Sequence, residues 1–201
     1  MLSIEKEYNE KYGMVPEDSD ERYQYMIQKI KSPTFKERLD TFIHEIKQRE
    51  TNTISFTIYL LPKATPRPRL GKGGLFYVKG ASDNKKFFRN FLQDTEYPLI
   101  TTPVIFSCNA YFPIPSSMTQ IEKMAAELGL IRPISKPDWD NVAKTYCDMI
   151  QDTLLYDDSL IIEGTSKKYY SLKPRVEISL TYFTTHDSAF NEKKMQQKLG
   201  K

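Results

Sequence analysis

Six aspartates lie in one stretch of the chain, "SKPDWDNVAKTYCDMIQDTLLYDDSL", which runs from Ser135 to Leu160. Carboxylates that converge without His or accessible Cys suit a hard divalent cation. Mg²⁺ prefers oxygen ligands and commonly uses one or two carboxylates together with water and substrate phosphate. Such a cation can activate water toward a phosphodiester. The stretch therefore indicates hydrolytic phosphoryl transfer, if the fold brings its two ends together.

The first two acids, Asp138 and Asp140, flank the tryptophan of the stretch. In an extended chain this spacing puts both carboxylates on one face and turns Trp139 the other way, as a core anchor. Asp140 could instead cap the helix that follows, where the positive helix end favours a carboxylate. Both alternatives place the two acids at the entrance to a helix.

A helix is predicted over residues 141–152, with an apolar side and a polar side. Lys144 lies on the polar side, one turn after Asp140, where a lysine could contact a scissile phosphate or its developing charge. Asp157 and Asp158 follow the helix, and a return loop could bring this pair back toward the first acids. The spacing leaves open which member of the pair faces a metal.

Other sites with similar spacing fit less well. A calcium-binding EF-hand loop that began at Asp138 would need Gly at its sixth position and Glu at its twelfth, where the chain has Ala143 and Met149. A nucleotide-sugar site would need a glycine loop that cradles the nucleotide, and none is visible. The remaining alternative is purely structural, with a capping aspartate, an exposed helix side and an acidic turn.

A basic segment precedes the acidic one. Between Pro62 and Leu92, eight lysines and arginines are opposed only by Asp83. A local imbalance of this size is an electrostatic footprint for a phosphate backbone, although a solvated hairpin would look the same. The basic residues are Lys63, Arg67, Arg69, Lys72, Lys79, Lys85, Lys86 and Arg89.

The remaining pattern predicts the elements around these segments. Helices are expected over 18–31 and 33–50 with an antiparallel pairing, and strands are expected where β-branched and aromatic residues alternate. The Gly73-Gly74 pair signals a hairpin turn, and Ser82 is expected to cap a helix. The predicted class is α+β, with a mixed or antiparallel sheet and packed helices. Further strands are expected over 101–113, 159–170 and 174–183, and a further helix over 116–129.

Composition sets broader limits. The net charge of +3 is too small to identify a nucleic-acid partner without the charge distribution. Cys108 and Cys147 lie in apolar segments and form neither a disulfide framework nor a thiolate metal site. No apolar run approaches the roughly 20 residues of a bilayer span. We therefore expect a soluble, cytoplasmic protein with no membrane partner.

The chain resembles the RusA family of Holliday junction resolvases, small metal-dependent endonucleases often carried by phages. The stretch "KPDWDNVAKTYCDMIQD…LLYDDSLI" is similar to the family's K/R-x-D-x-D-N-x-x-K-x-x-x-D signature and its later D-D pair. Upstream, "TIYLLPKATPRPRLGKGGLFYV" resembles its opening strand and basic hairpin, and "KKYYSLKPRVEISL" resembles its closing strands. Together these three blocks cover about residues 54–184.

The resemblance implies a role for each matching position. Metal-binding acids are implied at Asp138, Asp140 and Asp158, with Asp157 as the neighbouring acid and Lys144 as the catalytic lysine. Asn141 belongs to the motif as a supporting or helix-capping group. Candidate DNA contacts are Lys63, Arg67, Arg69, Lys72 and Lys136.

The resemblance also implies the larger organisation. It suggests a RusA-like nuclease domain over 51–185, a homodimer, and Mg²⁺ as cofactor, with Mn²⁺ as an alternative. The N-terminal helical extension, 1–50, and the polar tail, 186–201, fall outside the family-like region, and the tail is expected to be frayed. The resemblance also implies that the protein acts in the cytoplasm of a bacterium or of a phage-infected host cell.

Three functions follow for comparison. The first is an endonuclease that resolves four-way junctions by paired nicks. The second is a protein of phage replication or packaging that binds branched DNA without cutting it. The third is a structural protein whose N-terminal helices drive oligomerisation. For the nuclease, the same helices are a candidate contact for phage or recombination proteins.

Overall fold

The chain divides into two compact units, Met1–Arg49 and Glu50–Lys201. The structure, a computed structural model, describes most of the second unit and the end of the first. The described residues are 24, 27, 28, 30–64, 69–71, 74–76, 81–92 and 95–200. Among these, only the backbone is described at 69–71, 74–76, 81–85 and 89.

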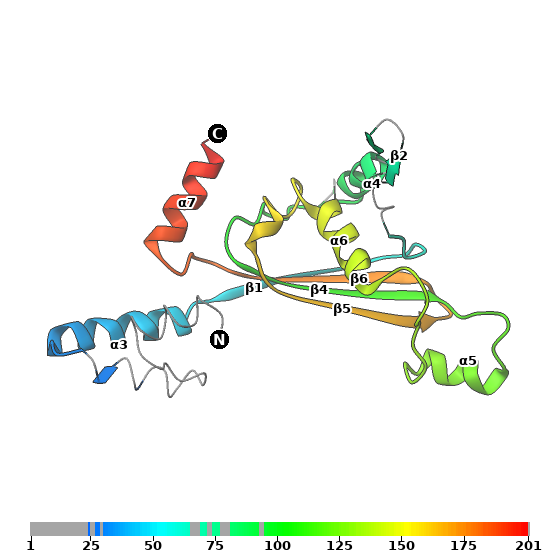
Figure 1. Cartoon of the computed structure of the whole chain (residues 1–201), viewed down its shortest axis with the longest axis horizontal. Coiled ribbons are helices and arrows are strands. Elements are labelled where there is room, and N and C mark those ends of the chain that lie inside the picture. The colour runs from blue at the N-terminus through cyan, green and yellow to red at the C-terminus, as the bar shows by residue number, and fades with distance from the viewer. Residues whose placement is uncertain are drawn as a thin grey trace. The chain divides into compact units, whose positions relative to one another are not determined.

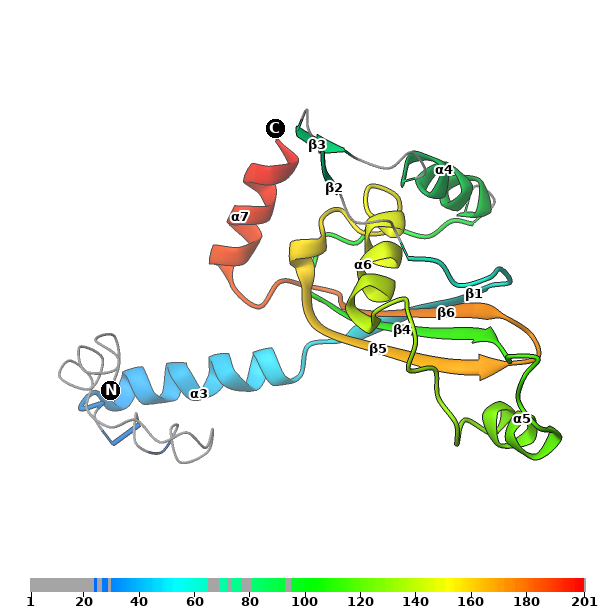
Figure 2. The same cartoon turned by 45° about the vertical axis from the view of Figure 1, so that its right-hand side comes forward.

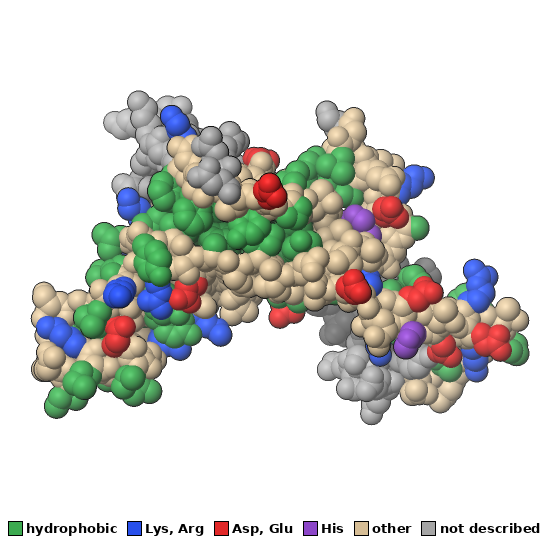
Figure 3. Space-filling model, turned by 180° about the vertical axis from the view of Figure 1, so that it is seen from behind, with side chains coloured by type: hydrophobic (Ala, Val, Ile, Leu, Met, Phe, Trp, Pro, Cys, Tyr) green, Lys and Arg blue, Asp and Glu red, His purple; other side chains and the backbone are tan. Residues whose placement is uncertain are grey.

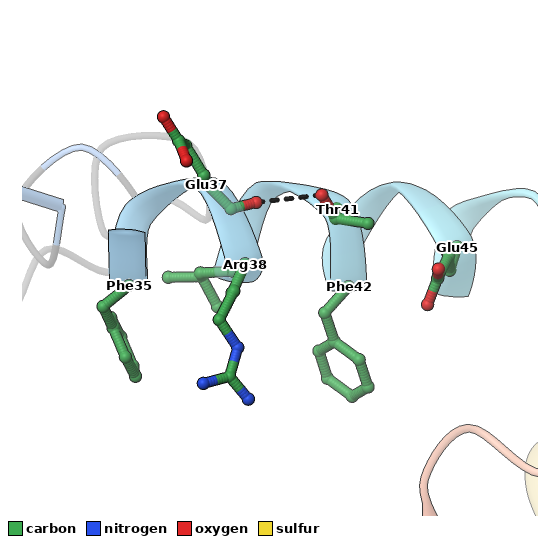
Figure 4. Close-up of a pocket in the computed structure, with 7 residues that line it drawn as sticks. Phe35, Glu37, Arg38, Thr41, Phe42 and Glu45 are labelled. Atoms are coloured by element: carbon green, nitrogen blue, oxygen red, sulfur yellow. Dashed lines mark hydrogen bonds between the residues drawn. The ribbon is translucent and has the colours of Figure 1, made fainter. Parts of the chain in front are cut away.

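The first unit contains helix α3 (Pro33–Lys47), which confirms the predicted helix and its start at Pro33 but ends three residues before Glu50. Ser32 caps it, since its hydroxyl accepts a hydrogen bond from the Phe35 amide at 3.3 Å. Phe35, Arg38 and Phe42 point to the same side of α3 and line a pocket along it (Figure 4). The helix predicted over 18–31 lies almost wholly outside the described residues.

The second unit is built on a four-stranded sheet in the order β1-β6-β4-β5. The pairs β1·β6 and β6·β4 are antiparallel, whereas β4 and β5 run parallel, so the sheet is mixed and the predicted α+β class is confirmed (Figure 1). The parallel pair needs a crossover, which contains two helices. The strands are β1 (Thr51–Ile58), β4 (Val104–Pro113), β5 (Ile161–Ser171) and β6 (Arg175–Phe183).

The two faces of the sheet differ in character. On β4, Phe106, Cys108 and Ala110 are fully buried, while the alternating Ser107 and Asn109 are half-buried. Helices α6 (Trp139–Ile150) and α4 (Ala81–Leu92) cover the apolar face, as Figures 1 and 2 show. The opposite face is polar. The sheet therefore buries its apolar face, and α6 lies on that face with its other side turned to solvent.

The basic segment begins with a small hairpin. Strands β2 (Arg69–Gly71) and β3 (Gly74–Phe76) pair antiparallel around the predicted turn. Helix α4 follows and starts at Ala81, two residues earlier than a cap at Ser82 would allow, so the prediction that Ser82 caps this helix is wrong. Its Phe88 is fully buried and contacts the Phe56 ring at a centroid distance of 5.4 Å.

Helix α5 (Gln120–Glu127) is shorter than the helix predicted over 116–129 because a capping box fixes its start at Thr119. The Thr119 amide donates to the Glu122 carboxylate at 2.7 Å. Figure 3 shows apolar and basic side chains gathered at the end of the molecule that carries α5.

The C-terminal tail is ordered, so the expectation of a frayed tail is wrong for its last turns. Ser188 caps helix α7 (Ala189–Leu199), which has Met195 buried. None of the described helices combines the length and the apolar character of a membrane span.

Candidate active site

Helix α6 positions the central motif. Its buried side fits the predicted apolar side, with Val142, Tyr146, Met149 and Ile150 all at most 5% exposed. This packing against β4, β5 and α4 fixes the rotation of the helix, so the opposite side faces solvent. Lys144 is on that exposed side, as predicted.

The first two acids lie at the start of α6, but not as an extended pair. Asp138 is the N-cap residue, with φ −63° and ψ 146°, and makes no side-chain capping bond, while Asp140 lies in the first helical turn. The prediction that Asp140 could cap the helix is therefore wrong. Trp139 is 62% exposed rather than a core anchor, because it is the first helical residue and does not follow strand alternation. Both carboxylates are exposed at the positive end of the helix.

Lys144 forms an ion pair with Asp148, one turn further along α6. The Lys144 Nζ to Asp148 Oδ1 distance is 3.7 Å, and the two side chains are 68% and 39% exposed. An exposed helical pair of this kind contributes only about 0.3–0.5 kcal/mol to stability. The lysine is thus held near the acidic side of α6 and remains accessible to a ligand.

The late acid pair lies at a short 3₁₀ helix, η1 (Asp158–Leu160), which follows α6 and leads into β5. Asp157 caps η1: its Oδ1 accepts a hydrogen bond from the Ser159 amide at 2.9 Å. These Ser159 bonds, with the nearby Lys198 ammonium, hold the pKa of the Asp157 carboxyl below its usual range. The structure therefore uses Asp157 to shape the turn.

Asp158 is exposed and lies within electrostatic range of α6. The pKa of the Cys147 thiol is raised to about 12, mainly by burial and to a smaller extent by the charges of Asp148 and Asp158, which Lys144 partly offsets. The thiol is therefore protonated at neutral pH and offers no thiolate to a metal. Asp158 is thus one of the charged groups whose field acts on the Cys147 thiol, together with Asp148 and Lys144 on α6.

The donor set fits a hard cation in its chemistry. Asp138, Asp140 and Asp158 offer carboxylate oxygens. Across the described part of the chain, no group of three or more His, Cys, Asp or Glu side chains is placed to hold a metal ion. Mg²⁺ needs only one or two carboxylates when water and a substrate phosphate supply the rest. The assignment of all three acids to one metal remains a prediction.

Asn141 is half-buried in the first turn of α6. Its backbone carbonyl accepts a hydrogen bond from the Thr145 hydroxyl at 2.7 Å, which tightens this turn. A supporting role for the Asn141 side chain stays a prediction.

Two of the predicted DNA contacts have described side chains. Lys63 is exposed, and its backbone amide donates to the Tyr146 hydroxyl of α6 at 3.3 Å, which joins the start of the basic segment to this helix. Lys136 is exposed and precedes Pro137 in a cis peptide bond, just before the first acids. The other three predicted contacts have no described side chain: Arg67, Arg69 and Lys72.

The segment before the acids is fastened to the sheet. The Lys168 ammonium on β5 donates to the Ser135 carbonyl at 2.8 Å and to the Pro137 carbonyl at 3.0 Å. The Ser166 hydroxyl, also on β5, donates to the Trp139 carbonyl at 3.1 Å. Two strand residues thus fix the backbone on both sides of Asp138.

Comparison with known proteins decides the family. The family model described as endodeoxyribonuclease RusA matches residues 60–181, which include α6, η1, β5 and most of β6. The chain belongs to the RusA endodeoxyribonuclease family. This membership supports a Holliday junction endonuclease and confirms the resemblance read from the acidic motif. A RusA-family nuclease acts on branched DNA junctions, which also agrees with the basic segment.

A bacterial relative matches a similar share of the chain. The uncharacterized protein YqaN of Bacillus subtilis (strain 168) is 33% identical over 135 residues, which are 63% of this chain and 94% of YqaN. The RusA match does not include α3 or α7, so these two helices lie outside the matched region.

Sequence reasoning missed one group of residues beside the late acids. Lys198, at the end of α7, contacts both Asp157 and Ser159. A signal for α7 was present in Ser188, an N-cap residue, and in Gly200, which follows the last helical residue. Neither signal predicts where the helix docks.

Proposed function

We propose that the protein is a Mg²⁺-dependent endonuclease that cuts four-way DNA junctions in paired nicks, with Asp138, Asp140 and Asp158 as metal ligands. Mn²⁺ is expected to replace Mg²⁺, because both take oxygen ligands. The observation that carries the proposal is the arrangement on α6, with two exposed acids at its start and Lys144 one turn later. A bound Mg²⁺ would supply an activated water and neutralise charge on the phosphodiester.

The protein's own groups have separable roles in this proposal. The carboxylates of Asp138 and Asp140, at the start of a helix fixed by its buried side, orient the cation and the phosphate. The Lys144 ammonium stabilises the negative charge that develops on the phosphate oxygens as the bond breaks. Lys63 and Lys136 contact neighbouring phosphates and hold the strand in register.

The expected assembly is a homodimer. A four-way junction has near two-fold symmetry, and a two-fold dimer would present two copies of the α6 motif to opposite strands. Paired nicks then follow from symmetry. The N-terminal unit, with its exposed Phe35 and Phe42 side chains, is the proposed contact for phage or recombination proteins.

The test uses Asp140→Asn on a synthetic four-way junction. We expect the variant to bind the junction as well as wild type, because the change removes a charge from an exposed site. Cleavage in Mg²⁺ should fall by at least about 100-fold, since a metal ligand is lost. The matched control is Glu163→Gln, an exposed acid on β5 whose side chain lies on the sheet face away from α6.

The outcomes separate the functions considered. Full cleavage by Asp140→Asn would remove the proposed mechanism. Tight binding by the wild-type protein without cleavage in Mg²⁺ or Mn²⁺ would favour the protein that binds branched DNA without cutting it. Loss of the dimer on deletion of residues 1–50 would assign oligomerisation to the N-terminal unit.

A further inference from the structure

The end of helix α7 contacts three residues of the turn that carries the late acids: Tyr156, Asp157 and Ser159. The Lys198 ammonium donates to the Ser159 hydroxyl at 2.9 Å and lies 3.6 Å from the Asp157 carboxylate. The Lys198 carbonyl accepts a hydrogen bond from the Tyr156 hydroxyl at 2.8 Å. One residue of α7 therefore bonds to the residues on both sides of Asp158.

These contacts rest on a single apolar anchor. Met195, one turn before Lys198, is only 4% exposed and is the buried residue of α7. A cavity of about 190 Å³ remains between α7 and η1, lined in part by Leu160, Asp187 and Lys194. The helix is thus held mainly at Met195 and Lys198, and its other turns add little to the contact.

The turn itself has a defined internal structure that Lys198 completes. Asp157 caps η1 through the Ser159 amide, and the Leu160 amide donates to the Asp157 carbonyl at 3.1 Å. Asp158 is the residue enclosed by these bonds, and its own side chain is exposed toward solvent. A cation that bonds to the side chains on either side of Asp158 restricts the backbone from which its carboxylate projects.

We propose that Lys198 is a positioning residue that holds the Asp157–Ser159 turn and thereby sets the place of the Asp158 carboxylate in the active site. The proposal rests on the proposed function, because it gives Asp158 its role there. An isolated exposed ion pair would not suffice, since such pairs order little. Here one ammonium and the carbonyl of the same residue bond to three side chains within four positions of the chain.

The assignment differs from what the family match provides. The matched residues end at 181, whereas α7 begins at Ala189. Lys198 therefore lies outside the region that the family model matches, whereas Asp158, the residue that it positions, lies inside it. Members without a helix at this position would need another way to hold the turn.

The experiment compares Lys198→Met, Lys198→Arg and Lys193→Met in the full-length protein. Lys193 is exposed on the same helix and makes no hydrogen bond or ion pair with a described residue, so its variant is the matched control. Met195→Ala provides a second route, because it removes the anchor of α7 while Lys198 and the residues of the turn keep their side chains. Two quantities are measured: hydrogen exchange of the Leu160 amide, and single-turnover cleavage of a four-way junction at saturating protein.

We expect Lys198→Met to speed exchange at Leu160 and to slow cleavage by about tenfold, the lower end for groups that orient a metal ligand. Junction affinity should be unchanged. Lys198→Arg should restore most of both quantities, Met195→Ala should resemble Lys198→Met, and Lys193→Met should match wild type.

If Lys198→Met left either the Leu160 exchange rate or the cleavage rate unchanged, the proposal would be overturned. A residue that sets the place of Asp158 through the turn must affect both rates. A wild-type protein that cleaves no junction would instead defeat the proposed function. In that case exchange at Leu160 alone decides whether Lys198 holds the turn.

Discussion

Replacing Lys144 with methionine should separate catalysis from stability. Methionine keeps the length and the helix propensity of lysine but removes the charge. Among the described residues, the Lys144 side chain forms one ion pair, the exposed one with Asp148 at 3.7 Å. Loss of that pair should change the free energy of unfolding by no more than about 0.5 kcal/mol.

The expected effect on cleavage is much larger. A group that stabilises charge only in the transition state contributes about 2.7–4 kcal/mol to the barrier, which corresponds to a fall of roughly 10²–10³-fold in rate. Urea denaturation gives the first quantity, and single-turnover cleavage of a labelled junction in Mg²⁺ gives the second. Lys167→Met is the matched control, because Lys167 is an exposed lysine of β5 on the sheet face away from α6.

Two results would refute this reasoning. Cleavage within a few-fold of wild type would show that Lys144 does not act on the phosphate. A loss of stability well above the value expected for an exposed pair would show that the lysine has a structural role and that any loss of activity follows from it.

Four further predictions concern single groups. The pKa of Asp157 lies below its ordinary 3.8, so the carboxylate stabilises the folded protein above about pH 4. This contribution is lost as the pH falls through the folded-state pKa. The free energy of unfolding of Asp157→Asn should therefore fall less steeply with decreasing pH than that of wild type. Phe88→Ala, in a fully buried position, should lower the free energy of unfolding by about 3–5 kcal/mol in urea, and a loss below 1 kcal/mol would contradict the packing. Burial raises the pKa of Cys108 and Cys147 to about 12, so neither thiol should react with iodoacetamide at pH 8 until the protein is unfolded. Trp139 is the single tryptophan and is exposed beside the acids, so junction binding should quench its fluorescence, whereas an unchanged signal would place the DNA elsewhere.

Much of the nuclease region could be predicted from local pattern. The apolar side of α6 was visible in the spacing of Val142, Tyr146 and Met149, because burial of a helix side repeats every three to four residues. Lys144 followed directly as an exposed residue of the opposite side. The α+β class could also be predicted from the order of the expected helices and strands. The parallel pairing of β4 with β5 could not, because it depends on contacts between segments that are distant in the chain.

The errors have physical causes that a single sequence does not reveal. Trp139 was predicted to point inward from strand alternation, but the helix begins at that residue and redirects its side chain. Helix α7 has one buried residue, Met195, and so little apolar periodicity that its polar composition resembled a frayed tail. Its docking depends on Lys198 meeting the turn at Asp157, a contact between residues far apart in the chain.

The residues of the site were predicted from a sequence motif. The distance between the early acids and the late acid in the fold was not. The positions of Asp138 and Asp140 on α6 follow from sequence, as does the presence of a turn at Asp158. How closely the late acid approaches the early ones depends on the path of the chain after Ile150, which local propensity does not determine. A substrate phosphate and water are the expected remaining partners of a cation there.

The central claim is that this arrangement of acids and lysine cuts branched DNA. The most direct measurement is the mapping of cleavage products on a four-way junction labelled in turn on each strand, with Mg²⁺ present and with Mg²⁺ replaced by EDTA. The account predicts nicks at symmetric positions on two opposite strands, only when Mg²⁺ is present. Stable binding of the junction with all four strands intact in Mg²⁺ would contradict it.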